Sequence, residues 1–297
     1  MSWRELWTVL IGLDPPLQYF PPAVASIILF IIIFSFCFCM YRLSESFPPT
    51  IKMLTQDFFK TLAFCTYPFG LMILRKYHGD IGYALCSIPL NTATVLILSS
   101  GEGSPVGNWL LFVKGSQSLQ QCTIRIITQI GAGITAFRIG KTLMKLDLHP
   151  SFEENLSQTE CIAALNVAVT TGFIIELFGT TWDVWFHSQN FSDNLVLDKL
   201  LKFCNSSFTF CLGGYPTGMF RDPAKAIGLT FGCKGISPSQ HILVYFLAPL
   251  IGSYLAYRFM LHSTATKGNT FKPGKNFIDK KGDKKKKYGA DSIKKTE

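Results

Sequence analysis

Two short segments place a hydrogen-bonding side chain directly before a proline, where a short apolar stretch begins. They are Ser104-Pro105-Val106 and Asp222-Pro223-Ala224. The oxygen of a Ser or Asp side chain accepts a hydrogen bond from the first free amides of a helix, and a proline at the next position needs no donor and already has a helical φ. Each segment therefore predicts a helix start. Two helix starts that face one point would each place about half a positive charge there, which repels cations and orients water.

These two helix starts need longer helices around them. The chain has 297 residues, of which 48% are hydrophobic and 16% charged, so it is too apolar for an ordinary soluble enzyme of this size. Stretches of membrane-spanning length are predicted at 22–41, 57–75, 81–100, 120–140, 160–181, 195–213 and 240–261. The stretches 105–114 and 223–233 reach only about halfway across a bilayer. A short helix at membrane depth is tolerated where it is buried in protein or lines a cavity, so we expect a lined passage.

The spans fall into two similar halves. We expect an all-α transmembrane fold in which each half, 57–140 and 160–261, holds three spanning helices and one half-helix. The second half is inverted relative to the first, because an odd number of crossings separates them. The predicted domains are an N-terminal segment 1–56 with an extra helix at 22–41, a channel domain 57–261 and a basic disordered tail 262–297. The 22–41 helix is interpreted as retained, because no small-x-small cleavage pattern follows it.

The formal charge of +9 is concentrated at the C-terminus, where eleven lysines follow residue 262. A polybasic tail after a last span indicates the cytoplasmic side. It is either a solvated topology signal or a site for anionic lipid, and nucleic acid is not an expected partner. The final residues, with Lys294 and Lys295, are similar to a di-lysine signal for retrieval to the endoplasmic reticulum.

A cytoplasmic tail fixes the sides of the other loops by counting backward along the spans. The segment 141–159 then lies on the non-cytoplasmic side, while 101–119 and 182–194 are cytoplasmic. Three sequons occur, at Asn155, Asn190 and Asn205. Asn155 is the one expected to carry glycan, because Asn190 would face the cytosol and Asn205 would lie in or near the bilayer.

Nine cysteines are present, and no C-x-x-C pair occurs. Eight lie in or at the edge of apolar stretches and are interpreted as small buried hydrophobes: Cys37, Cys39, Cys65, Cys86, Cys122, Cys161, Cys204 and Cys211. Cys233 follows the second half-helix, so it either faces the passage or packs. His187 and His241 have no partners at metal-ligand spacing, so neither a metal, a cofactor nor a catalytic residue is predicted.

At this point the chain resembles the aquaporin superfamily, and in particular its divergent intracellular branch, the unorthodox aquaporins or superaquaporins. The resemblance covers about 57–261. In the second half it rests on residues in the family's order and spacing: Gly213-Gly214, Thr217-Gly218, Asp222-Pro223-Ala224, His241, Val244-Tyr245, Ala248-Pro249 and Gly252. The first half adds a smaller set: Gly103-Ser104-Pro105, Gln129 and Gly131-Ala132.

The resemblance implies an hourglass pore in which two Asn-Pro-Ala boxes meet at the middle of the membrane. This chain departs from both boxes, with Ser104 and Val106 in the first and Asp222 in the second. The capping role survives, because Ser and Asp accept amide bonds as Asn does. The donor role is reduced, since an ionised Asp donates nothing and a Ser has one hydroxyl. We hypothesise that Asp222 is ionised and is neutralised by Lys225 or Arg221.

Lys225 occupies the place where many family members carry the arginine of the selectivity constriction. By family spacing Phe210 and Met219 would flank it, with Arg221 nearby. The alternative is structural: Arg221 and Lys225 extend to the headgroups, and the two apolar side chains belong to the core. Glu176, an acid inside a span, does not match the family's helix glutamates and is interpreted as a buried acceptor or as a sign that its span ends earlier.

The function that the resemblance implies is passive flow of water or a small neutral solute such as glycerol or hydrogen peroxide. The setting would be an intracellular membrane, the endoplasmic reticulum, and the assembly a homotetramer. An enzyme is not expected, because no nucleophile and base pair accompanies the charged residues. An energy-coupled carrier is disfavoured, because no phosphate-binding loop is present. The alternative is a closed, aquaporin-like membrane scaffold.

Overall fold

The computed structural model describes residues 19–157 and 161–266. Its helical elements, in chain order, are α2 (Pro22–Leu43), η1 (Ser44–Ser46), α3 (Pro49–Ile97), α4 (Pro105–Val113), α5 (Leu119–Met144), α6 (Pro150–Ser157), α7 (Val169–Ser188), α8 (Leu195–Thr217), α9 (Pro223–Thr230), α10 (Pro238–Ile242), the π-helical turn η2 (Leu243–Leu247) and α11 (Ala248–Thr266). No β-strand occurs in the described ranges, where one isolated bridge pairs Ile162 with Lys234. The all-α prediction is confirmed.

The described chain divides into two units, with the boundary between Tyr257 and Arg258. The first unit holds every helix down to the first half of α11. The second unit is described over 258–266, which are the last turns of α11. All packing and site geometry below concern the first unit.

The longest element, α3, contains two of the predicted spans. Its backbone leaves helical geometry at Gly79, with φ 65° and ψ −165°, a conformation that glycine adopts without a steric penalty. The parts before and after Gly79 correspond to the predicted spans 57–75 and 81–100. By length and apolar composition, three helical stretches of the described chain are suited to cross a membrane: Pro22–Ser46, Pro49–Ile97 and Pro238–His262.

The predicted span 160–181 is wrong at its start, because α7 begins at Val169. The apolar residues before it are held in a loop by another segment. Cys161 and Cys233 form a disulfide across 72 residues, with their Cα atoms 4.9 Å apart. The Ala163 amide donates to the Lys234 carbonyl at 2.9 Å. The interpretation of Cys161 as a buried hydrophobe, and of Cys233 as facing the passage or packing, is therefore corrected.

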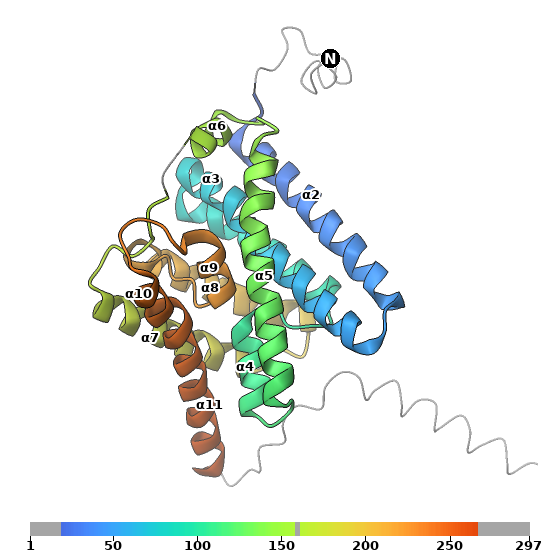
Figure 1. Ribbon diagram of the computed structural model, residues 1–297, viewed down its shortest axis with the longest axis vertical. Coiled ribbons are helices and arrows are strands. Elements are labelled where there is room, and N and C mark those ends of the chain that lie inside the picture. The colour runs from blue at the N-terminus through green and yellow to red at the C-terminus, as the bar shows by residue number, and fades with distance from the viewer. Residues whose placement is uncertain (1–18, 158–160, 267–297) are drawn as a thin grey trace, which may run out of the picture. The chain divides into compact units, whose positions relative to one another are not determined.

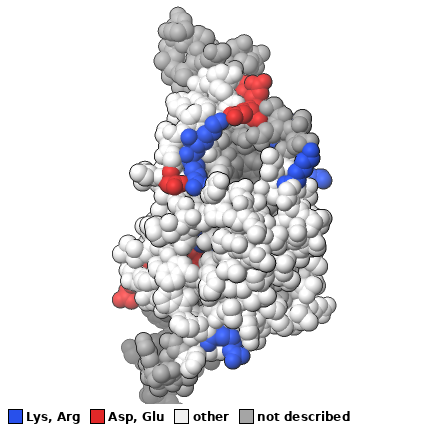
Figure 2. Space-filling model, turned by 90° about the vertical axis from the view of Figure 1, so that its left-hand side faces the viewer, with Lys and Arg blue, Asp and Glu red and all other residues white. Residues whose placement is uncertain are grey.

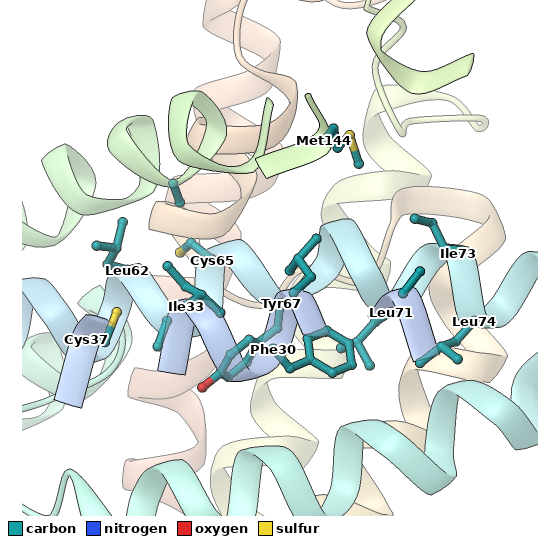
Figure 3. Packing of buried hydrophobic residues seen from close by; sticks show 14 of the residues in the cluster. Phe30, Ile33, Cys37, Leu62, Cys65, Tyr67, Leu71, Ile73, Leu74 and Met144 are labelled. Atoms are coloured by element: carbon teal, nitrogen blue, oxygen red, sulfur yellow. The ribbon is translucent and has the colours of Figure 1, made fainter. Parts of the chain in front are cut away.

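The extra N-terminal helix packs along the first part of α3, and the two run side by side (Figure 1). Phe30 meets the Tyr67 ring edge-on, with the centroids 5.9 Å apart (Figure 3). A Cβ on Gly70 would lie 2.6 Å from the Phe30 ring, so the missing side chain admits that ring. The Ser26 hydroxyl donates to the Gly70 carbonyl at 3.1 Å. This seam belongs to the main hydrophobic core, which also takes in Met144 of α5.

Charge and apolar surface are separated on the face shown in Figure 2. Lys, Arg, Asp and Glu side chains gather toward two ends, and the broad belt between them is almost free of charge. Large apolar side chains remain exposed on several helices, among them Ile81, Phe178 and Leu212. An apolar surface of this extent marks contact with a membrane rather than with water. The protein is an integral membrane protein.

Candidate functional site

The first half-helix, α4, begins at a serine cap. Ser104 has extended backbone geometry, and its hydroxyl oxygen accepts from the Val106 amide at 3.3 Å. Pro105 follows at the first helical position, where its missing N–H leaves no donor unpaired. The helix ends at Val113, nine residues long, and so it cannot cross a bilayer.

The second half-helix, α9, begins in the same way at Asp222. One carboxylate oxygen accepts from the Ala224 amide at 2.9 Å and from the Lys225 amide at 3.4 Å. An aspartate at this position is also stabilised by the positive end of the helix dipole. The helix has eight residues and ends at Thr230.

The two caps lie against each other inside the protein. The Ser104 side chain lies close enough to influence the Asp222 carboxylate, and α4 contacts α9. Asp222 is 8% exposed and Val106 is 7% exposed. Two helix N-termini therefore converge at one buried point, with one carboxylate between them.

The half-helix α9 is docked on α5 through glycines. A Cβ on Gly133 would lie 2.1 Å from the Ala224 carbonyl oxygen, and a Cβ on Gly228 would lie 2.2 Å from the Gly133 carbonyl oxygen. Each glycine therefore lets one backbone touch the other, which is how membrane helices commonly achieve close packing. Figure 1 shows α9 beside the middle of α5.

The half-helix α4 is docked differently. The Trp109 indole N–H donates to the Leu250 carbonyl of α11 at 3.1 Å. Asn108, fully buried, donates to the Gln129 side chain of α5 at 2.9 Å. Side-chain hydrogen bonds thus fix α4, whereas backbone contact fixes α9.

A buried glutamate holds the loop that leads into α9. Glu176 of α7 is fully buried and accepts from the Thr217 hydroxyl at 2.7 Å, from the Phe220 amide at 3.1 Å and from the Arg221 amide at 2.8 Å. Met219 and Arg221 have φ of 43° and 52°, the left-handed region that non-glycine residues rarely adopt. The three bonds to Glu176 keep this strained loop in place, so of the two interpretations of Glu176, the buried acceptor is the one observed.

A buried aspartate holds the loop that leads into α4. Asp57 of α3 accepts from the Glu102 amide at 2.7 Å. It also forms a two-point ion pair with Arg125 of α5, with N to O distances of 2.6 and 2.9 Å. The Lys60 ammonium donates to the Gly101 carbonyl at 3.0 Å. From the sequence, Asp57 is only the first residue of the predicted span 57–75, because nothing local distinguishes an acid that contacts a loop 45 residues later.

A cavity of about 350 Å³ lies beside the start of α9. The four residues expected at the constriction all line it: Phe210, Met219, Arg221 and Lys225. A Cβ on Gly179 or Gly213 would lie 2.6 and 2.8 Å from the Met219 terminal carbon, so Met219 also fills space between α7 and α8.

The two cations expected to neutralise Asp222 differ in their partners. The Arg221 guanidinium binds Asp183 of α7 at 2.9 Å and donates to the Thr209 hydroxyl at 2.6 Å. It is therefore directed to α7 and α8 and not to Asp222. The Lys225 charge acts on Asp222 through space. The sequence alone did not identify Asp183, because its ion pair with Arg221 joins residues 38 positions apart.

The remaining predicted residues lie away from this site or outside the described chain. Asn155 lies in α6, and Lys294 and Lys295 fall outside the described residues. His241 is fully buried and bonds the Thr230 hydroxyl through Nε2 at 3.0 Å. No group of three or more His, Cys, Asp or Glu in the described ranges could hold a metal ion.

No family model matches the chain. Aquaporin-11 of Milnesium tardigradum is 21% identical over 239 residues, which are 80% of this chain and 87% of that protein. Aquaporin-11 of Rattus norvegicus is 23% identical over 256 residues, 84% of this chain and 92% of that protein. Among solved structures, the aquaglyceroporin from Plasmodium falciparum superposes with a TM-score of 0.53 at 15% identity, over 71% of this chain and 95% of that one.

Two half-helices with capped N-termini inside a bundle of longer helices give this chain an aquaglyceroporin-like fold. The chain is similar to aquaporin-11 over most of its length, and this similarity fits the aquaporin superfamily and its divergent, unorthodox branch. These similarities support a membrane channel rather than an enzyme.

Proposed function

We propose that the protein is a passive channel for water and small neutral solutes, with glycerol and hydrogen peroxide as the first candidates. The observation that carries this proposal is the contact of two half-helices, α4 and α9, whose starts are capped by Ser104 and by the buried Asp222. Helix N-termini at that point orient water and oppose cations. The expected constriction is formed by Lys225, Phe210, Met219 and Arg221, which border one cavity.

The proposal includes an ionised Asp222 that is neutralised by Lys225. An aspartate between two helix N-termini would weaken the barrier to cations. The Lys225 charge, in the first turn of the same helix, acts on that carboxylate and restores the barrier. Arg221 contributes to the same region but is already paired with Asp183.

Reconstituted vesicles test this function. Stopped-flow shrinkage should be faster with the full chain than in protein-free vesicles, and arms with glycerol and peroxide identify the solute. Ionic current should be absent. Asp222→Asn should keep water flux, because Asn caps a helix as well as Asp does, and Asp193→Asn in a surface loop is the matched control. Cation current through the wild type would rule out the neutralisation by Lys225.

A closed membrane scaffold is the second candidate. It is favoured by the capping bonds of Ser104 and Asp222, because the Val106, Ala224 and Lys225 amides already occupy these oxygens, which a passing solute would need. Vesicles that shrink no faster than empty ones, with all three solutes, would support the scaffold over the channel.

The proposed setting is the endoplasmic reticulum, with a cytoplasmic C-terminus and a homotetrameric assembly. The disulfide between Cys161 and Cys233 supports the orientation, because disulfides persist in oxidising compartments, and both cysteines flank loops expected on the non-cytoplasmic side. If Asn155→Gln removes the glycan of the protein and Asn190→Gln leaves it in place, this topology is supported. A glycan on Asn190 would contradict it.

A further inference from the structure

All the charged side chains that line the cavity beside α9 are positively charged hydrogen-bond donors. Three cationic side chains line it: Arg75 of α3, Arg221 of the loop before α9, and Lys225 of α9. No carboxylate is among the described residues that line it. The surface of this cavity is therefore rich in donors and poor in negatively charged acceptors.

The nearby acids do not line the cavity, but two of them pair with cations of its wall. Asp80 binds the Arg75 Nε at 2.6 Å, and Asp183 binds Arg221 at 2.9 Å. Asp222 caps the amides of α9. In the described part of the chain, the Lys225 ammonium forms no hydrogen bond or ion pair, although the Asp222 charge acts on it from a distance. A half-buried ammonium at membrane depth without a direct acceptor favours an acceptor brought by a ligand.

Most of the rest of the cavity wall is apolar or aromatic, and Asn91 adds one polar amide. Tyr83 and Phe210 stack with their ring centroids 4.4 Å apart, and the Arg75 guanidinium carbon lies 5.0 Å from the Phe210 centroid. A volume of about 350 Å³ falls in the range of small-molecule sites and far exceeds the roughly 30 Å³ share of one water. These walls suit a ligand with a flat apolar body and one anionic end.

We propose that this cavity binds a small organic monoanion, a carboxylate or sulfonate, with its charged end at Lys225 and Arg75 and its apolar body against Phe210. An occupied cavity would place the ligand among the residues of the expected constriction and would slow solute flux. The effect on flux depends on the channel function proposed above. The binding itself does not.

Benzoate and benzamide are a matched pair of probes, because they share shape and differ in charge. Calorimetric titration of the full chain in detergent should show benzoate binding at least about tenfold tighter than benzamide, since a hydrogen bond to a charged group is stronger by more than about 1.4 kcal/mol. Rising salt should weaken benzoate binding and leave benzamide unchanged.

Variants locate the site. Lys225→Gln and Arg75→Gln should each weaken benzoate binding about fivefold or more, by loss of one charged contact. Lys225→Arg keeps the charge and should bind benzoate nearly as well as the wild type. Lys145→Gln, an exposed lysine after α5 that does not line the cavity, is the matched control. If a glutamine variant does not fold, the affinities of the wild type and of Lys225→Arg for benzoate and benzamide still test the anion site.

The anion site and the channel function can be disproved independently of each other. Charge-dependent benzoate binding to a protein that conducts no solute would uphold the anion site and remove the channel. Flux that benzoate does not slow, together with equal affinity for benzoate and benzamide, would overturn the anion site and leave the channel standing. Benzoate binding that survives both glutamine substitutions would also overturn it.

Discussion

The two loops that lead into the half-helices are each held by a buried acid, but the acids act through different chemistry. In the first half, Asp57 is held in a two-point ion pair with Arg125. In the second half, Glu176 accepts from one hydroxyl and two backbone amides. Among the described residues, no cationic side chain lies within ion-pair distance of Glu176. The two halves thus hold their equivalent loops with different interactions, an ion pair in the first half and hydrogen bonds from neutral donors in the second.

The difference has energetic consequences. A buried ion pair is costly to break, because the remaining charge stays in a medium of low polarity. A carboxylate that accepts from neutral donors loses less when it is replaced by an amide, because an amide oxygen still accepts. The first half should therefore respond more strongly than the second to removal of a single charge.

The second half has a covalent tie that the described part of the first half lacks. The disulfide joins the loop before α7 to the loop after α9. The strained residues Met219 and Arg221 also lie in this half. A strained loop needs surroundings that fix it from several directions, and the disulfide, together with Glu176, provides them.

The largest effect is expected from Asp57→Asn. The substitution leaves the Arg125 guanidinium buried without its counter-ion, which should cost about 3–5 kcal/mol of stability. The unfolding midpoint of the purified protein in detergent measures the loss. Glu45→Gln, in the exposed pair with Arg42, is the matched control and should change stability by less than about 1 kcal/mol.

The double variant Asp57→Asn with Arg125→Gln sharpens this result. Removing both charges avoids the unpaired cation, so the double variant should be more stable than Asp57→Asn alone. Equal losses in the single and double variants would mean that the ion pair is not what holds the first loop.

The second largest effect is expected from loss of the disulfide. Cys161→Ser and Cys233→Ser should each lower stability by about 2–4 kcal/mol, because the tie closes a long loop. The Cys161→Ser, Cys233→Ser double variant should lose no more than either single variant, and reductant should lower the wild type to the same level. Cys39→Ser, an exposed free cysteine, should change nothing. A stability loss that differs between the two single variants would point to packing rather than to the bond.

The parts of the site that the sequence predicted depend on local signals. A cap residue followed by proline identifies the starts of α4 and α9, because capping involves amides only two or three residues away. The long apolar runs predict the spans for the same reason, since hydrophobicity is a property of neighbouring residues.

The parts that the sequence did not predict depend on distant contacts. Asp57 meets Arg125, Arg221 meets Asp183, and Cys161 meets Cys233, and each pair is separated by tens of residues. Cys161 precedes an apolar run, so its neighbours indicate a span and not a bond. Composition cannot identify a partner that is brought near only by folding.

A smaller effect is expected from Glu176→Gln. The amide keeps one acceptor oxygen and converts the other to a donor, so one loop donor loses its partner, at a cost of about 1–3 kcal/mol. Flux should fall with stability, because the strained loop positions α9. A loss as large as that of Asp57→Asn would remove the distinction between the two halves. Glu153→Gln, in the exposed part of α6, is the control.

Two glycines of α5 differ in whether they contact α9. A Cβ on Gly133 meets the Ala224 carbonyl, whereas a Cβ on Gly131 meets nothing within 4 Å. Gly133→Ala should destabilise by about 1–3 kcal/mol through overpacking. Gly131→Ala should stabilise by about 0.5–1 kcal/mol, since alanine favours a helix. Unfolding midpoints measure both, and effects of the same sign would contradict the close contact of α5 with α9.

The smallest effect is expected at the docking of α4. Trp109→Phe removes the indole bond to the Leu250 carbonyl, which should cost about 0.5–1.5 kcal/mol. That carbonyl keeps a second donor, the Ser253 hydroxyl at 2.8 Å, and so it is not left unpaired. Flux should change little, because α4 is also held by Asn108 through Gln129. A stability loss larger than that of Gly133→Ala would show that hydrogen bonds hold a half-helix more firmly than backbone contact does. Trp185→Phe is the control, because the Trp185 indole forms no hydrogen bond among the described residues. This variant measures the effect of the smaller ring alone.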